Sequence, residues 1–144
     1  MQLILSALAG AIGGASIAGL GMIYSAAVGG GFWSLPNSIG GILLGPKAGD
    51  TRSLGWVTLV GMVSHIALSV LYGVAIVYLA QRDGLGYVIT GISVGILIWL
   101  FNHLFVGALL PGAKKHAEFN PLWLAVSLHA LYGAIAGAVA AALI

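Results

Sequence analysis

The stretch WVTLVGMVSHIALSVLYGVAIVYLA, residues 56–80, contains no charged side chain and is longer than the ~20 residues that an α-helix needs to cross a bilayer. Three further stretches are similarly apolar, at about residues 5–29, 87–110 and 122–143. Since backbone polar groups in lipid must be satisfied within the segment itself, each stretch is predicted to form a transmembrane helix. The chain is therefore predicted to be an all-α polytopic membrane protein with four spans.

The composition agrees with this assignment. Hydrophobic residues make up 60% of the chain and charged residues only 6%, whereas roughly a quarter of the residues in a soluble domain are charged. The four stretches take up most of the sequence, so we expect one four-helix transmembrane domain, residues 1–144. The first stretch lacks the basic start of a signal peptide, and it is longer than the apolar region of such a peptide. We therefore expect it to be a retained span.

The absence of cysteine and the scarcity of charge exclude several classes of function. Without thiols the chain cannot form disulfides, iron–sulfur clusters, thiolate metal sites or covalently attached c-type haem. The formal net charge of +2 comes without a basic stripe, so no nucleic-acid partner is expected. The acidic residues all lie in predicted loops, and no nucleophile–base pair or phosphate loop is present. The sequence therefore disfavours an enzyme that acts on its own.

The spans form two tandem helical hairpins with a shared pattern. In each half, a span rich in glycine leads through a proline-containing loop to a span with a histidine upstream of a Tyr-Gly pair, at Tyr72 and Tyr132. The first of these loops also contains an apolar segment at about residues 34–45, which is too short to cross a bilayer. We expect it to be a short interfacial helix or a re-entrant segment.

The basic residues predict the orientation. Loops 30–55 and 111–121 carry all the basic residues except Arg82, which lies in the opposite connection. By the positive-inside rule these two loops face the cytoplasm and both termini are external, so we expect a multi-pass protein of the inner (cytoplasmic) membrane. The basic residues of the two loops are Lys47, Arg52, Lys114 and Lys115. An interfacial aromatic belt is predicted at the same level, formed by Trp33, Trp56, Phe119 and Trp123.

Glycine is abundant, with 23 residues in the chain, and its positions predict how the helices pack. Small residues at four-residue spacing let helix backbones approach closely, which stabilises helix pairs in lipid. The first, third and fourth spans each carry such a ridge, and the predicted helix-packing glycines are Gly10, Gly14, Gly91, Gly95, Gly133 and Gly137. The pattern leaves open whether these ridges serve the bundle or a second subunit, although three ridges exceed the need of one small bundle.

Three histidines, His65, His103 and His129, lie inside the predicted spans. With a rise of about 1.5 Å per residue, each lies roughly 11 to 14 Å along its helix from the basic loops, so the three share one depth. A polar side chain in hydrocarbon is costly unless it has a partner. The cluster therefore has to be explained.

Four interpretations of the histidines are open. In the simplest, each neutral imidazole forms a hydrogen bond between helices. Alternatively, His65 and His129 would ligate haem b from two helices that run in the same direction. All three histidines would suit a copper or zinc site, because neutral imidazole binds both metals. The fourth interpretation is a proton or cation relay, although no carboxylate lies within the spans to support it.

Three segments carry a resemblance to known sequences: SHIALSVLYG at 64–73, GILIWLFNH at 95–103 and HALYG at 129–133. They resemble a group of small four-helix bacterial and archaeal membrane proteins of unassigned function. The resemblance spans nearly the whole chain and implies the four-helix architecture. It implies no catalytic residue.

These observations favour a small accessory or structural subunit that packs against partner helices in a larger membrane complex, such as a redox or respiratory assembly. Two alternatives are kept. The chain would be a membrane b-type cytochrome or histidine metal-site protein if the histidines bind a cofactor. It would be a small channel or transporter if several copies assemble. In each case the partners are the lipid bilayer and other membrane subunits or copies of the chain.

Overall fold

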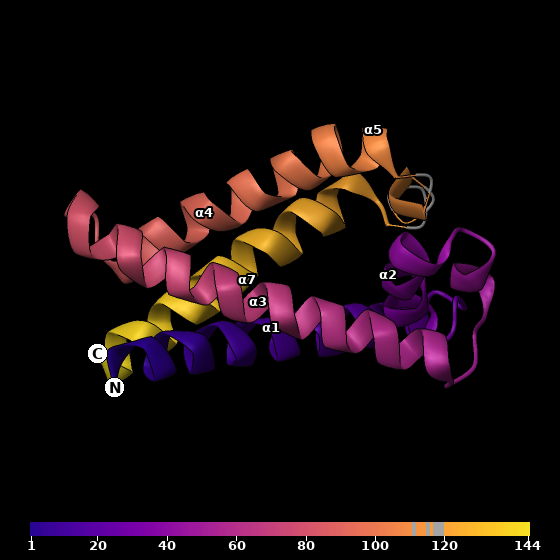
Figure 1. The fold of residues 1–144 in the computed structure, drawn as a ribbon, viewed down its shortest axis with the longest axis horizontal. Coiled ribbons are helices and arrows are strands. Elements are labelled where there is room, and N and C mark those ends of the chain that lie inside the picture. Colours follow the sequence, from indigo (N-terminus) through magenta and orange to yellow (C-terminus); the bar gives the residue numbers. More distant parts are fainter. Residues whose placement is uncertain (111, 115, 117–119) are drawn as a thin grey trace. The chain divides into compact units, whose positions relative to one another are not determined.

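The computed structural model describes all residues except 111, 115 and 117–119. Lys115 and Phe119, which the sequence placed in a basic loop and in the aromatic belt, lie outside the described residues. The described part is helical and contains no strand (Figure 1). Four of its helices are long and apolar enough to cross a membrane, which confirms the predicted four-span, all-α fold.

The observed spans lie close to the predicted ones. They are α1 (Gln2–Ala27), α3 (Trp56–Asp83), a third helix (Tyr87–Leu109) and α7 (Leu122–Leu143). The third helix is not uniform: α4 (Tyr87–Phe101) continues through a π-helical turn, η2 (Asn102–Val106), into the short α5 (Gly107–Leu109). No sequence pattern predicted this turn.

Glycines with positive φ explain where the helices end. Gly29, at φ 79°, follows the last residues of α1, so α1 ends before the predicted limit at residue 29. At the other end of the second span, α3 continues to Asp83 until Gly84, at φ 70°, ends it. Only glycine adopts such angles without steric cost, so these positions favour the observed turns.

The segment predicted at about 34–45 is a helix, α2 (Ser34–Leu44). Pro36 lies in its first turn, where no backbone donor is needed, and Gly45, at φ 96°, follows its last residue. A short 3₁₀ helix, η1 (Ala48–Asp50), comes next. Whether α2 lies in the interface or is re-entrant stays a prediction.

The chain divides into two compact units. Unit 1 comprises Met1–Ile17, Ile66–Trp99 and Val126–Ile144, and unit 2 comprises Ala18–His65 and Leu100–Ala125. Each long helix therefore contributes one part to each unit. The expectation of a single domain, residues 1–144, stays a prediction beside this division.

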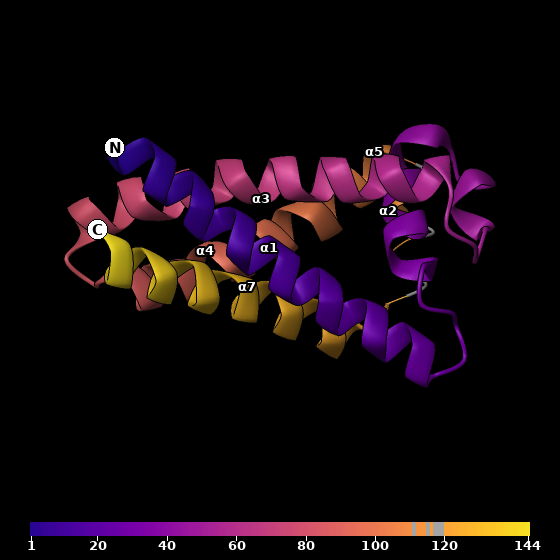
Figure 2. The ribbon, with the colours of Figure 1, turned by 90° about the horizontal axis from the view of Figure 1, so that it is seen from below.

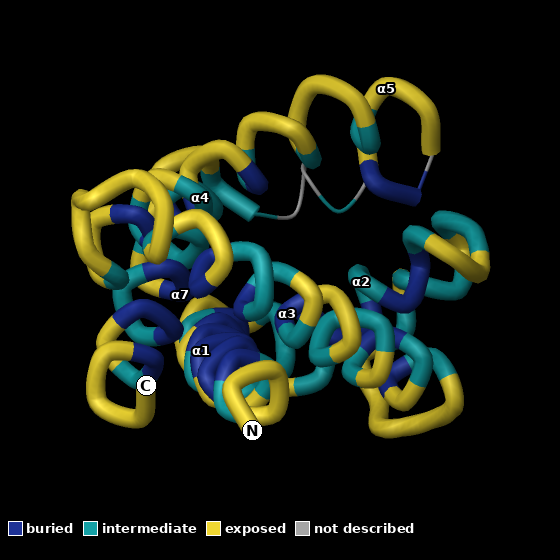
Figure 3. The backbone as a smooth tube through the Cα atoms, turned by 60° about the vertical axis from the view of Figure 1, so that its left-hand side comes forward, coloured by how far each residue is buried: buried dark blue, intermediate teal, exposed yellow. Residues whose placement is uncertain are grey.

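Unit 1 is built from close antiparallel helix pairs (Figure 2). On α1, buried residues recur three and four positions apart and form one stripe, dark blue in Figure 3, from Ser6 to Ile17. Two apolar clusters fill this unit. The first contains Ile17, Ile76, Ile98, Tyr132 and Ala136, and the second contains Ala9, Val77 and Ala140.

Candidate functional site

The α1–α3 contact in unit 1 depends on glycine. A Cβ added at Gly10 would lie 2.9 Å from the Cα of Gly73, and one added at Gly14 would lie 2.5 Å from the Cβ of Ser69. Backbone or short side chains occupy the space that a methyl group would need. Any larger residue at Gly10 would therefore push the two helices apart.

The α4–α7 contact has the same character. A Cβ at Gly91 would lie 2.9 Å from the carbonyl carbon of Gly133, and one at Gly95 the same distance from that of His129. A Cβ at Gly137 would lie 2.7 Å from the carbonyl carbon of Tyr87. With Gly10 and Gly14, all six glycines singled out by the sequence therefore lie at contacts between helices of unit 1. Since these contacts occur within one chain, the glycines give no support to a second subunit.

The three histidines occupy different surroundings. His65 in α3 and His129 in α7 are half-buried, whereas His103, in the π-helical turn, is exposed. His65 and His103 belong to unit 2 and His129 belongs to unit 1. Among the described residues, no three His, Cys, Asp or Glu side chains are grouped so that they could hold a metal ion. Haem ligation by His65 and His129 stays a prediction.

Tyr132 provides a polar contact inside unit 1 that the sequence analysis missed. Its hydroxyl donates to the backbone carbonyl of Ser69 at 2.6 Å, and the ring is buried. The bond joins α7 to α3 at the level of the Gly14 contact. The Tyr132 phenol and the Ser69 backbone therefore connect these two helices.

Asn37 is the polar centre of unit 2 and has no exposed surface. Its amide nitrogen donates to the carbonyls of Thr51 and Ser53 at 2.8 and 3.0 Å. Its amide oxygen accepts a hydrogen bond from the hydroxyl of Thr58 at 2.5 Å. One side chain thus ties α2 to the loop after η1 and to the first turn of α3.

Glycine contacts hold α2 against its neighbours in the same unit. A Cβ at Gly40 would lie 2.9 Å from a side-chain carbon of Val57, and one at Gly61 would lie 2.9 Å from the backbone nitrogen of Gly40. Gly41 approaches Gly49 of η1 just as closely. α2 therefore crosses the beginning of α3 at backbone contact and is an integral part of unit 2.

His116 forms a second polar link to α2. The Nδ1 atom of His116 lies 2.8 Å from Ser38 Oγ, and the amide nitrogen of Asn120 lies 3.3 Å from His116 Nε2. Because an amide nitrogen only donates, Nε2 accepts and Nδ1 carries the proton that it donates to Ser38. The Ser38 hydroxyl in turn donates to the Leu35 carbonyl at 2.7 Å. This geometry does not activate Ser38 as a nucleophile. The link connects α2 to His116 and Asn120.

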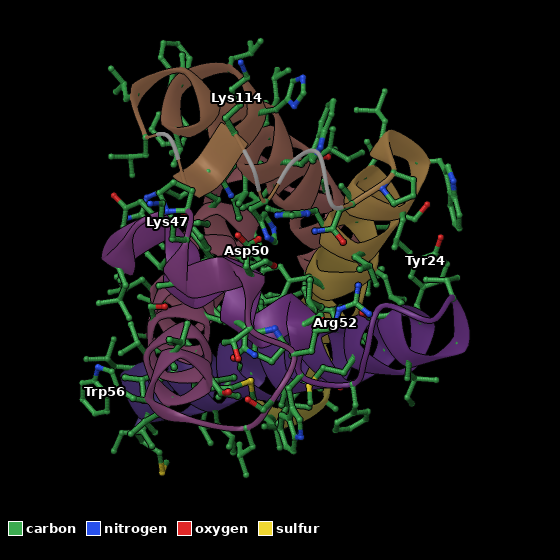
Figure 4. All side chains as sticks on the ribbon, turned by 90° about the vertical axis from the view of Figure 1, so that its right-hand side faces the viewer. Tyr24, Lys47, Asp50, Arg52, Trp56 and Lys114 are labelled. Carbon is green, nitrogen blue, oxygen red and sulfur yellow. The ribbon has the colours of Figure 1, made fainter. Side chains whose placement is uncertain are left out.

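The described charged side chains of unit 2 lie on one face. Figure 4 shows Asp50 toward the middle of this face, with Lys47, Arg52 and Lys114 around it. Arg52 also donates to the carbonyl of Gly29 at 3.4 Å, which joins the two ends of the first loop. The other described acidic residue, Asp83, is in the α3–α4 turn, where its carboxylate accepts from the Leu85 amide and the Thr90 hydroxyl. Its role in the structure is to shape that turn.

The end of the third span has the longest run of residues without a buried member in any of the four long helices. None of residues 99–110 is buried, and this range includes the whole π-helical turn. Phe101 and Phe105 stack on each other with ring centroids 5.3 Å apart. Asn102 and His103 lie beside them. The exposed large apolar side chains here are Leu100, Phe101, Leu104, Phe105, Leu109 and Leu110.

Comparison with known proteins identifies no relative: no family model, no curated protein and no solved structure matches the chain.

Proposed function

We propose that this protein is a small integral membrane subunit without chemistry of its own, which packs against a partner transmembrane helix through residues 100–110. The observation that carries the proposal is the exposure of this segment. Only 17% of the most apolar window of the third span is buried, against 28% to 39% for the other three spans. The third span is thus the one that the chain's own helices cover least.

The residue types on this segment support a protein partner in addition to lipid. Asn102 and His103 carry polar side chains at a depth where hydrocarbon surrounds an isolated helix, and polar residues in spans usually face protein. The stacked pair Phe101 and Phe105 offers a large, rigid apolar surface next to them. A partner helix with one hydrogen-bonding side chain at this level would match both features.

The π-helical turn further supports a role for this segment. Turns of this kind are rare and frequently occur at functional sites. Here the turn contains both polar residues, and its five-residue register appears in the bond from the Gly107 amide to the Asn102 carbonyl. The turn changes the direction in which the following side chains point.

The proposed orientation places the basic loops in the cytoplasm. It rests on the same imbalance that the sequence displays: four basic residues in loops 30–55 and 111–121 against Arg82 on the other side. The partner contact would then lie in the cytoplasmic half of the membrane.

Site-specific photo-crosslinking in cells tests the proposal. A photoreactive amino acid replaces Phe105, and the matched control replaces Leu71, an exposed position on α3; their exposed fractions are 57% and 63%. We expect a discrete protein adduct from position 105, weakened in the background of His103→Leu, and only lipid adducts from position 71. Lipid adducts alone at position 105 would refute the proposal.

A second tagged copy distinguishes the kind of partner. If the adduct at position 105 contains a differently tagged copy of the same chain, the protein is a homo-oligomer and the accessory-subunit assignment is wrong. If it contains another membrane protein whose co-purification in mild detergent is lost with Phe101→Ala and Phe105→Ala together, the assignment is supported.

A further inference from the structure

A groove of about 270 Å³ lies in unit 2 between the last turn of α2 and the beginning of α3. Its α3 wall consists of residues spaced three and four positions apart, so one face of the helix forms it. The adjoining face of α3, with Val57 and Gly61, packs against α2. The lining residues are Leu43, Trp56, Leu59, Val60, Val63 and Ser64.

The exposed surface of the groove is apolar. Ser64 donates its hydroxyl to the carbonyls of Val60 and Gly61 at 2.8 and 3.1 Å, within its own helix, and the only other polar group among the lining side chains is the indole N–H of Trp56. A sugar, nucleotide or ion would lose its hydration there without compensation. The occupant that this wall favours is hydrocarbon.

The surroundings of the groove indicate which kind of lipid would place its hydrocarbon chain there. Trp56 begins α3 and is 69% exposed, as an indole at the membrane surface would be. Lys47 follows the last residue of α2 by three positions and is exposed, and Figure 4 shows it on the same side of the unit as Trp56. A chain that enters the groove from the membrane surface would therefore carry its polar end past an ammonium group, which favours an anionic headgroup.

We propose that this groove binds one acyl chain of an anionic phospholipid, with the headgroup phosphate beside Lys47. The inference is independent of the proposed partner contact, because it uses α2 and α3 rather than residues 100–110. A bound lipid would fill the space beside α2 and fix the α2–α3 contact. Lys47 contributes the charge recognition and Val63 and Leu59 contribute the apolar wall.

Native mass spectrometry in mild detergent tests this site, with phosphatidylglycerol or phosphatidylcholine of the same acyl chains as probes. We expect one saturable phosphatidylglycerol adduct per chain and weaker retention of phosphatidylcholine. Val63→Phe should abolish the saturable adduct by filling the groove. Leu71→Phe, the same kind of enlargement at an equally exposed position of α3 outside the groove, should leave it intact.

A second pair of variants tests the role of charge. Lys47→Gln should reduce phosphatidylglycerol retention about fivefold, to the level of phosphatidylcholine, whereas Lys114→Gln should not change it. Equal retention of both lipids, or adducts that never saturate and ignore Val63→Phe, would overturn the proposal. So would a Val63→Phe variant that separates a protein complex while its lipid adducts stay unchanged, because the groove would then hold a partner helix.

Discussion

Replacing Asn37 by alanine should separate the stability of unit 2 from the formation of the spans. The side chain is completely buried and forms three hydrogen bonds, to Thr51, Ser53 and Thr58. Each such bond contributes about 0.6 to 1.5 kcal/mol in a folded protein, so the loss of three should cost the variant about 2 to 4.5 kcal/mol. The lower part of this range applies if Thr58 redirects its proton to the Ser53 carbonyl, which lies 3.4 Å from its hydroxyl.

The assay is thermal unfolding in mild detergent, followed by hydrogen exchange of the loop after α2. We expect Asn37→Ala to lower the melting temperature and to speed exchange at residues 45–55, while membrane insertion stays normal because the apolar spans alone direct it. Asn102→Ala is the matched control, since this asparagine lies in the same unit but is not buried. If both variants change stability equally, or if exchange at residues 45–55 stays unchanged, Asn37 does not hold this unit together.

Three further predictions concern the helices. Gly10→Ala should destabilise the bundle, because its Cβ would meet the backbone of Gly73. Gly19→Ala, with open space around its Cβ, should be neutral or should stabilise the protein by up to about 1 kcal/mol. Equal effects of the two variants on thermal unfolding would contradict the close α1–α3 contact. Reporter fusions after Gln81 and at the C-terminus should read as external and one at Lys47 as cytoplasmic; a cytoplasmic C-terminus would reverse the orientation. If the histidines serve packing, purified protein should be colourless and free of copper and zinc, and alanine at His65, His103 or His129 should each cost about 1 kcal/mol of stability. A Soret band that His65→Ala or His129→Ala removes would establish haem binding instead. Stoichiometric copper or zinc that is lost with any one of the three substitutions would establish a metal site.

The number and position of the spans could be predicted from the sequence, because a single apolar segment in lipid can satisfy its backbone hydrogen bonds only as a helix. An uncharged apolar stretch of sufficient length must form its own hydrogen bonds, and this holds whatever its neighbours are. The short helix α2 was predictable for a related reason, since Pro36 and Gly45 mark its limits and its length forbids a crossing. The positions of the six packing glycines were also visible as a repeat along each helix, but the helices that they meet were not.

Tertiary structure decided which faces of the helices meet, because a helix that is apolar all round carries no signal for the direction in which it packs. Asn37 and Asn102 show the difference. Asn37 is enclosed by loop carbonyls and Asn102 lies in an exposed π-helical turn, although no local sequence pattern distinguishes the two environments. His116 is similar, since its contact with Ser38 joins residues 78 positions apart. The sequence therefore determined that the spans lie in lipid and where the helices form. The long-range contacts that create the polar centre, the groove and the uncovered segment depend on the direction in which each side chain points.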